Sequence, residues 1–214
     1  MLAILVMALV APVSAQMKME FGVKAGVNLA NLTGDDADME EADKKMLLGF
    51  GGGAFGRFLL AEGQFCIQPE ILYMMKGAKY EGTGDAEDAE AKIKANYICI
   101  PILLKYNIPT EGGFKPNVFV GPEFGILMSA DITEEYEGEE EEEDIKDYLK
   151  SLDLGLTFGA GFDYAVNETG KLTFDARYTM GLSTVDDTFG DDEELTIKNA
   201  VISVMVGYAF GMGE

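Results

Sequence analysis

The chain has 214 residues and a net charge of -22 at pH 7, and it contains no histidine and no tryptophan. This negative charge opposes binding to nucleic acid, and the lack of imidazole removes the commonest general base and a frequent metal ligand. The length fits one domain or two. Because no stretch has the composition of a linker, we expect a single domain.

The first fifteen residues, M-L-A-I-L-V-M-A-L-V-A-P-V-S-A, form an apolar run that is too short to span a bilayer. The run ends in Val13-Ser14-Ala15, which has the small-x-small pattern of a signal-peptidase site, although no basic residues precede it. A buried strand or helix is the alternative. We predict that residues 1–15 are a signal peptide and that residues 16–214 form the mature domain.

No later window contains about 18 uncharged apolar residues, so residence in a membrane would require β-strands. Alternation of apolar and polar residues predicts eight strands. They are expected at residues 20–30, 47–59, 65–77, 96–107, 116–129, 152–165, 171–183 and 198–210.

In every segment one residue parity is apolar and uncharged, whereas the other mixes glycine with charges of both signs. A soluble sandwich would place its charges outside, and a lipocalin-like carrier would need an apolar interior. The pattern instead indicates a barrel that is apolar outside and polar inside. Aromatic residues of the apolar parity should form two rings, one including Phe65 and Tyr106 and the other Phe50 and Tyr73.

The connections alternate between short and long. The long ones, near 31–46, 78–95, 130–151 and 184–197, hold six, five, eleven and six acidic residues, which is 28 of the 38 in the chain. In an up-and-down barrel all long connections share one rim, and both termini lie at the other. We therefore predict an all-β, eight-stranded antiparallel up-and-down transmembrane β-barrel of the outer membrane with a negative outer rim.

The polar parity carries Lys24, Arg57, Lys76, Lys105 and Arg177 against Glu70, Glu123, Asp153, Asp163 and Asp175. Side chains just fill the interior of an eight-stranded barrel, so these charges should pair and leave no aqueous channel. The predicted lumen charge network consists of Lys24, Arg57, Glu70, Lys105, Glu123, Asp175 and Arg177. Its expected role is stability rather than activity.

Two motifs resemble ligand-binding sequences but have a simpler structural interpretation. Gly51–Gly56 has the letters of a dinucleotide fingerprint but lies inside a predicted strand, where glycine relieves crowding of the lumen. The run Glu139–Asp144 could bind divalent cations through carboxylate oxygens, but it lacks the spacing of a calcium loop. A solvated, disordered run that calcium or magnesium screens weakly is the simpler expectation. Neither motif predicts a cofactor, a fixed metal site or an enzyme.

Several pieces of the chain resemble the PorT-like, eight-stranded outer-membrane β-barrel family of Bacteroidetes-type bacteria. The pieces are F-G-V-K-A-G-V-N at 21–28, Q-P-E-I-L-Y at 68–73, I-P-I-L-L-K-Y at 100–106, V-F-V-G-P-E-F-G at 118–125, F-G-A-G-F-D-Y at 158–164 and A-R-Y-T-M-G-L at 176–182. The resemblance implies an outer-membrane barrel, and one branch of the family is linked to protein secretion.

The chain departs from that family at Cys99, where relatives commonly have glutamate, and it has a second cysteine at Cys66. Both fall on the inward parity of neighbouring strands, so a disulfide is geometrically allowed, and two buried free thiols are the alternative.

We expect a monomeric, non-enzymatic protein with a structural or interaction role, such as envelope integrity, adhesion or contact with a secretion complex. Its expected partners are outer-membrane lipid and envelope or secretion-complex proteins. The alternative function is that of a small-ligand carrier or narrow transporter that uses the barrel lumen.

Overall fold

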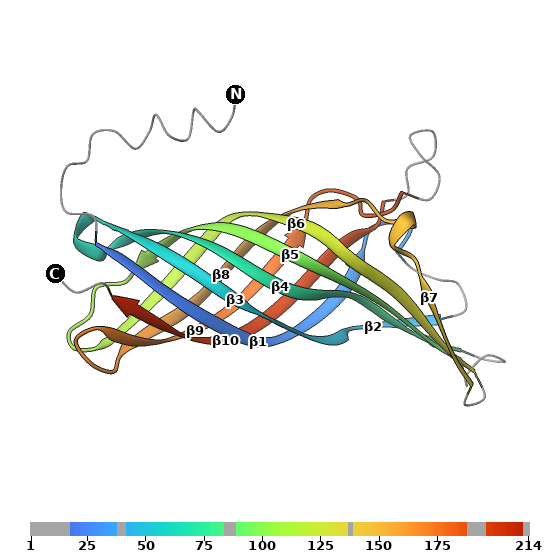
Figure 1. The fold of residues 1–214 in the computed structure, drawn as a ribbon, viewed down its shortest axis with the longest axis horizontal. Coiled ribbons are helices and arrows are strands. Elements are labelled where there is room, and N and C mark those ends of the chain that lie inside the picture. The colour runs from blue at the N-terminus through green and yellow to red at the C-terminus, as the bar shows by residue number, and fades with distance from the viewer. Residues whose placement is uncertain (1–17, 38–41, 84–88, 137–138, 188–195, 212–214) are drawn as a thin grey trace, which may run out of the picture.

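The computed structural model describes residues 18–37, 42–83, 89–136, 139–187 and 196–211, which leaves the predicted signal peptide outside the described residues. Eight long antiparallel strands form a barrel (Figure 1). They are β1 (Met19–Thr33), β3 (Leu47–Leu60), β4 (Phe65–Gly82), β5 (Glu90–Asn107), β6 (Phe114–Tyr136), β8 (Leu152–Ala165), β9 (Gly170–Gly181) and β10 (Lys198–Gly211). Two short strands, β2 (Ala42–Lys45) and β7 (Glu139–Asp144), and two 3-10 turns, η1 (Ala61–Gly63) and η3 (Lys146–Tyr148), complete the described elements.

The ring closes because the first and last strands pair, with Phe21 opposite Phe210 and Leu29 opposite Ile202. Each of the other long strands pairs with its neighbour in sequence, including β4 with β5. Closure leaves no open edge in the ring, which satisfies the backbone hydrogen-bonding groups without water. The predicted eight-stranded up-and-down barrel is therefore confirmed. The described residues contain no helix whose length and hydropathy would let it cross a membrane.

The two faces of each strand have the predicted chemistry. Val23, Leu48 and Ile71 point outward and are 57%, 68% and 61% exposed, whereas Lys24 and Glu70 point inward and are 4% and 1% exposed. The polar groups that lipid would exclude are thus gathered in the lumen.

Aromatic side chains form ring contacts at two levels of the outer face. Phe65 and Tyr106 have ring centroids 5.1 Å apart, and Phe114 and Phe162 are also 5.1 Å apart, near the short turns. Further along the barrel, Phe50 lies 5.9 Å from Tyr73 and Phe158 lies 5.5 Å from Tyr178. These two levels match the aromatic rings at the interfaces of a membrane barrel.

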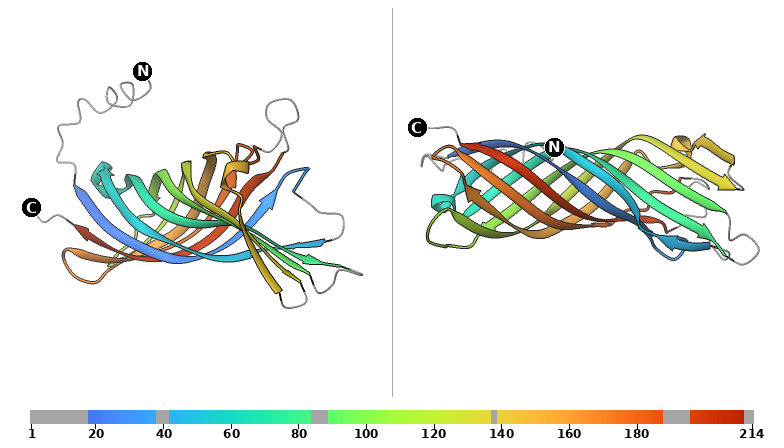
Figure 2. Two further views of the ribbon diagram at one scale, coloured as in Figure 1. Left: turned by 45° about the vertical axis from the view of Figure 1, so that its right-hand side comes forward. Right: turned by 90° about the horizontal axis from the view of Figure 1, so that it is seen from below.

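The two ends of the barrel differ in shape. The described ends of the chain, near Lys18 and Gly211, lie with the short turns and η1 at one end (Figure 1). At the other end, β4, β5 and β6 continue past the body of the barrel and are joined by β2 and β7 (Figure 2). We call residues 78–82, 90–95, 131–136 and 139–144 the sheet extension.

Much of the sheet extension lies in segments for which the sequence predicts loops. Pairing of β4 with β5 continues to Glu81 opposite Glu90. Lys79 forms ion pairs with Glu81 and Glu90 at 3.0 and 2.5 Å, and Lys92 also pairs with Glu90. Hydrogen bonds from Lys79 and then Lys92 lower the pKa of Glu90, so this carboxylate keeps its charge and loses the interaction only as the pH falls through that lowered pKa.

The acidic run Glu139–Asp144 forms strand β7, and all six of its residues are exposed. Pairing with β6 places Glu134 opposite Glu141 and Glu135 opposite Glu140. The expectation of a solvated run is correct, but the expectation of disorder is wrong for this segment. Like charges directly opposite each other destabilise a strand pair, so β7 is held against electrostatic repulsion.

Candidate functional site in the barrel lumen

A four-residue charge cluster crosses the middle of the lumen. Lys24 of β1 donates to Glu70 Oε1 at 2.8 Å and to Asp175 Oδ2 at 2.5 Å. Arg177 of β9 donates to Glu70 Oε2 at 2.8 Å and to Asp175 Oδ2 at 2.9 Å. Each cation contacts both carboxylates, and none of the four residues is more than 4% exposed. Strands on opposite sides of the barrel are therefore joined by buried, charge-assisted hydrogen bonds.

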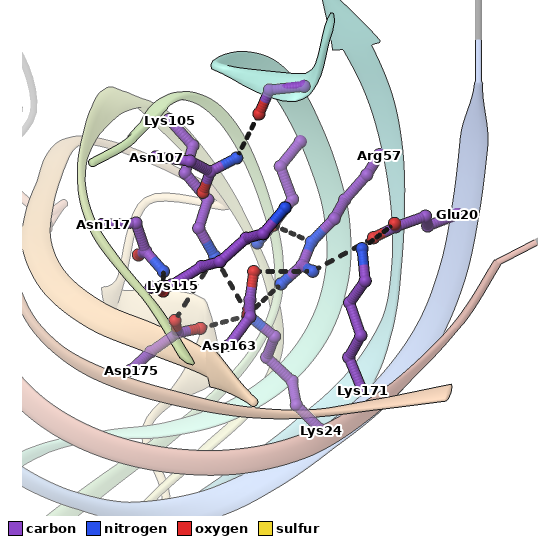
Figure 3. A network of polar contacts seen from close by, with 12 residues as sticks. Glu20, Lys24, Arg57, Lys105, Asn107, Lys115, Asn117, Asp163, Lys171 and Asp175 are labelled. Atoms are coloured by element: carbon purple, nitrogen blue, oxygen red, sulfur yellow. Dashed lines mark hydrogen bonds and ion pairs between the residues drawn. The ribbon is translucent and has the colours of Figure 1, made fainter. Parts of the chain in front are cut away.

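Arg57 of β3 forms the next layer toward the short turns (Figure 3). Its guanidinium donates to both carboxylate oxygens of Asp163 at 3.1 Å and to Glu20 Oε2 at 3.3 Å. Gln68 accepts from Arg57 Nε at 2.6 Å and donates to Glu70 Oε1 at 2.6 Å, which connects the two layers.

Lys105 lies in the same layer but forms only long ion pairs. Its Nζ is 3.7 Å from Asp163 and 4.0 Å from Asp175, and it has no hydrogen-bond partner among the described residues, although Lys105 is only 1% exposed.

Glu123 is separate from the other six predicted network residues. It accepts from Lys76 Nζ at 3.0 Å and from the Thr157 hydroxyl at 2.9 Å. Lys76 also donates to Asp153 Oδ2 at 3.0 Å, and Asn199 donates to the same oxygen at 3.0 Å. The lumen thus holds two charge clusters: one around Glu70 and Arg57, and one around Lys76.

Three inward aromatic rings lie against these cations and are missing from the sequence-based site. Lys24 and Arg57 are both 4.8 Å from the centroid of the Phe55 ring, and Arg177 is 5.4 Å from that of Phe119. The third ring, Tyr97, contacts Lys76 at 5.1 Å. Phe55 alternates in step with Arg57, and Phe119 with Glu123, so both rings are on the inward parity of their strands. That parity is the sequence signal that could have identified them as cation-contacting residues. Glu20, which shares the parity of Lys24, could have been found in the same way.

An apolar layer lies beside the Lys76 cluster and was not predicted. It consists of Leu72, Met74, Ala95, Tyr97, Cys99, Leu127, Ala130 and Met205. Ile145 and Leu149, which flank η3, pack against this layer. The segment after β7 therefore returns to cover the outer end of the lumen.

The structure does not support a disulfide between the two cysteines. Cys66 lies opposite Lys105 and Cys99 lies opposite Leu72 in the pairing of β4 with β5. The six-residue offset between Cys66 and Leu72 corresponds to about 20 Å at about 3.3 Å per residue, which is far beyond disulfide reach. Both are buried free thiols. Alternation correctly gives their shared face but not their positions along the strands.

The charged side chains of the lumen are arranged in ion pairs and hydrogen bonds with one another. Within the described ranges, no group of three or more histidine, cysteine, aspartate or glutamate side chains is arranged to hold a metal ion. The carboxylates of both clusters accept hydrogen bonds from lysine, arginine, glutamine, threonine or asparagine side chains.

Several solved structures are similar to this chain at low sequence identity. Neisserial surface protein A is 15% identical over 89% of this chain and 96% of its own, with a TM-score of 0.48. The outer membrane protein OprG from Pseudomonas aeruginosa is 15% identical over 92% and 98%, with a TM-score of 0.49. The outer membrane protease OmpT from Escherichia coli is 8% identical over 91% and 97%, with a TM-score of 0.48. Similarity at this level says nothing about a shared activity.

No curated protein matches the chain. A family model described as "Outer membrane protein beta-barrel domain" matches residues 14–187. This range covers most of the chain and ends before β10, whose pairing with β1 closes the ring. The chain therefore belongs to the outer membrane protein beta-barrel domain family and is a β-barrel of the bacterial outer membrane.

Proposed function

We propose that this protein is a monomeric, non-conducting and non-enzymatic barrel that holds the acidic sheet extension outside the cell for contact with other molecules. The filled lumen is the observation that carries the proposal. Lys24, Glu70, Asp175 and Arg177 span the interior and are at most 4% exposed, which supports a lumen closed to water. Because side chains fill the lumen, a surface that binds other molecules would lie at one of the two ends of the barrel.

The sheet extension has the features of a binding surface for cationic partners. Its backbone is fixed by the pairing of β4 with β5, β5 with β6 and β6 with β7, and β7 exposes six carboxylates. In outer-membrane barrels the long connections face outward, so this charge would face the surroundings of the cell. A basic protein surface is the partner we propose, with calcium or magnesium as weak screening ions.

Envelope integrity, adhesion and contact with a secretion complex are the roles that fit such an arrangement. We propose membership of the PorT-like branch on the sequence pieces given above, such as Q-P-E-I-L-Y at 68–73.

Hydrogen exchange of the sheet extension tests this proposal. We expect a lysine-rich peptide, added at low ionic strength to the protein in lipid nanodiscs, to slow amide exchange in residues 131–136 and 139–144 several-fold. The reason is that peptide cations relieve the repulsion between Glu134 and Glu141 and between Glu135 and Glu140.

The matched control is the Glu140→Gln/Glu141→Gln variant. It should exchange more slowly without peptide and respond less to it, because the opposed charges have been removed. Exchange that the peptide leaves unchanged in the natural chain would argue against the extension as a cation-binding surface.

A second candidate function, that of a small-ligand carrier, is favoured by one observation. A cavity of about 190 Å³ lies at the outer end of the lumen, lined mainly by apolar residues such as Leu32, Ile93, Tyr97, Ile145 and Leu149. It would suit a small apolar ligand. A rise in melting temperature with such ligands would favour this function.

Single-channel recording tests whether the lumen conducts. We expect no conductance steps in planar bilayers containing the folded protein, because two charge clusters and an apolar layer fill the interior. A water-filled porin in the same lipid is the positive control. Reproducible ohmic steps from the natural chain would contradict the proposal and support a narrow transporter.

A further inference from the structure

A cavity of about 550 Å³ opens at the end of the barrel that carries the termini and short turns. It is unusually basic for a chain with a net charge of -22. Five cationic residues line it: Lys18, Arg57, Lys105, Lys115 and Lys171. Three acidic residues line it as well: Glu20, Asp163 and Glu168. We call this cavity the basic basin.

Two of the basin's three acids are already paired. Asp163 is held by both terminal nitrogens of Arg57. Glu20 contacts Arg57 and also Lys171.

Lys105 is the strongest sign that the basin can hold an anion. An ammonium group has three donors, and burial without acceptors is costly. Lys105 is 1% exposed, it lines the basin, and its Nζ has no hydrogen bond to any described residue. The two carboxylates nearest to it, at 3.7 and 4.0 Å, are bound more closely by other cations.

Lys115 supplies a second free charge at the mouth. It is exposed on β6 and forms no ion pair with a described residue. Figure 3 shows Lys105, Lys115 and Lys171, from three different strands, around Arg57 and Asp163. Lysines converging from separate strands suit a compact anion with several oxygen atoms, for which lysine acts as a point charge.

We propose that the basic basin binds a phosphate group, with Lys105 at its base and Lys115 and Lys171 at its wall. Short turns face the periplasm in outer-membrane barrels, so the ligand would enter from that side. The phosphate could belong to a soluble phosphate ester or to the headgroup of an inner-leaflet phospholipid. The site lies at the opposite end from the sheet extension, so it does not depend on the function proposed above.

Calorimetric titration with inorganic pyrophosphate is the test for a soluble ligand. The protein is folded in phosphatidylcholine nanodiscs, and ionic strength is kept constant with sodium chloride. We expect saturable binding that weakens about tenfold or more in Lys105→Met and in Lys115→Gln, since each loses a charge-assisted contact. Lys115 is exposed, so its variant should fold normally. Lys92→Gln, in the sheet extension, is the matched control and should bind as the natural chain does.

Binding of a lipid headgroup is tested by native mass spectrometry of protein released from nanodiscs that contain phosphatidylglycerol. Retention of phosphatidylglycerol that Lys105→Met and Lys115→Gln reduce, without pyrophosphate binding, would assign the site to a lipid headgroup. Pyrophosphate binding that the same variants weaken would assign it to a soluble phosphate. Absence of both ligands from the natural chain, or binding that neither variant changes, would overturn the proposal.

Discussion

Replacing Glu70 with alanine should lower the free energy of unfolding of the barrel by about 3–5 kcal/mol. Glu70 accepts hydrogen bonds from Lys24, Gln68 and Arg177 in the middle of the lumen. Without it, Lys24 and Arg177 must share Asp175. The large effect arises because a buried positive charge is left without its partner, not because a single ion pair is intrinsically strong.

Urea unfolding in lipid vesicles measures this effect. The chain has no tryptophan, so circular dichroism and the fraction of heat-modifiable protein on gels are suitable readouts. Glu81→Ala is the matched control on the same strand, because Glu81 is partly exposed and pairs with Lys79 outside the barrel body. It should change the unfolding free energy by less than about 1 kcal/mol. Equal losses in the two variants would show that the Glu70 cluster does not stabilise the barrel.

Replacing Lys76 with methionine should cost a similar amount, about 3–5 kcal/mol, for the opposite reason. Lys76 is the cation that contacts both Glu123 and Asp153, each at 3.0 Å. Methionine nearly fills the same space but leaves two buried carboxylates facing each other. The loss should therefore come from uncompensated negative charge rather than from a cavity.

A compensating variant distinguishes charge from packing. Lys76→Met/Glu123→Gln/Asp153→Asn removes all three charges with little change in volume, and it should recover most of the lost stability. Lys79→Met, three residues further along β4 and in the sheet extension, is the matched control and should change stability by less than about 1 kcal/mol. If the triple variant were no more stable than Lys76→Met, packing of the lysine stem would explain the loss instead.

The sequence predicts the barrel well because alternation directly reports which face a residue occupies. A lipid-facing wall excludes charged side chains. Val23 and Ile71 can therefore be placed on the outer face, and their charged neighbours Lys24 and Glu70 on the inner face. Strand number and the sides of the two rims follow from the count of segments and the lengths of their connections.

Positions along the lumen are not predicted by the same pattern. They depend on the tilt and stagger of the strands, which alternation does not encode. Glu123 and Glu70 both point into the lumen yet belong to different clusters, and Cys66 and Cys99 share a face yet lie far apart. The sheet extension was missed for another reason: its charged residues suggest solvated loops, whereas cross-strand pairs such as Lys79 with Glu90 support a sheet there.

The seam between β1 and β10 has a consequence for how the protein is made. It joins residues 20–33 to residues 198–211, so the contacts that close the ring span nearly the whole chain. Such distant contacts slow folding, since most of the chain must be ordered before they form. Until the last strand arrives, the edges of β1 and β9 remain open and can pair with other chains. The interval between synthesis of the first strand and delivery of the last is therefore when this protein is most exposed to aggregation.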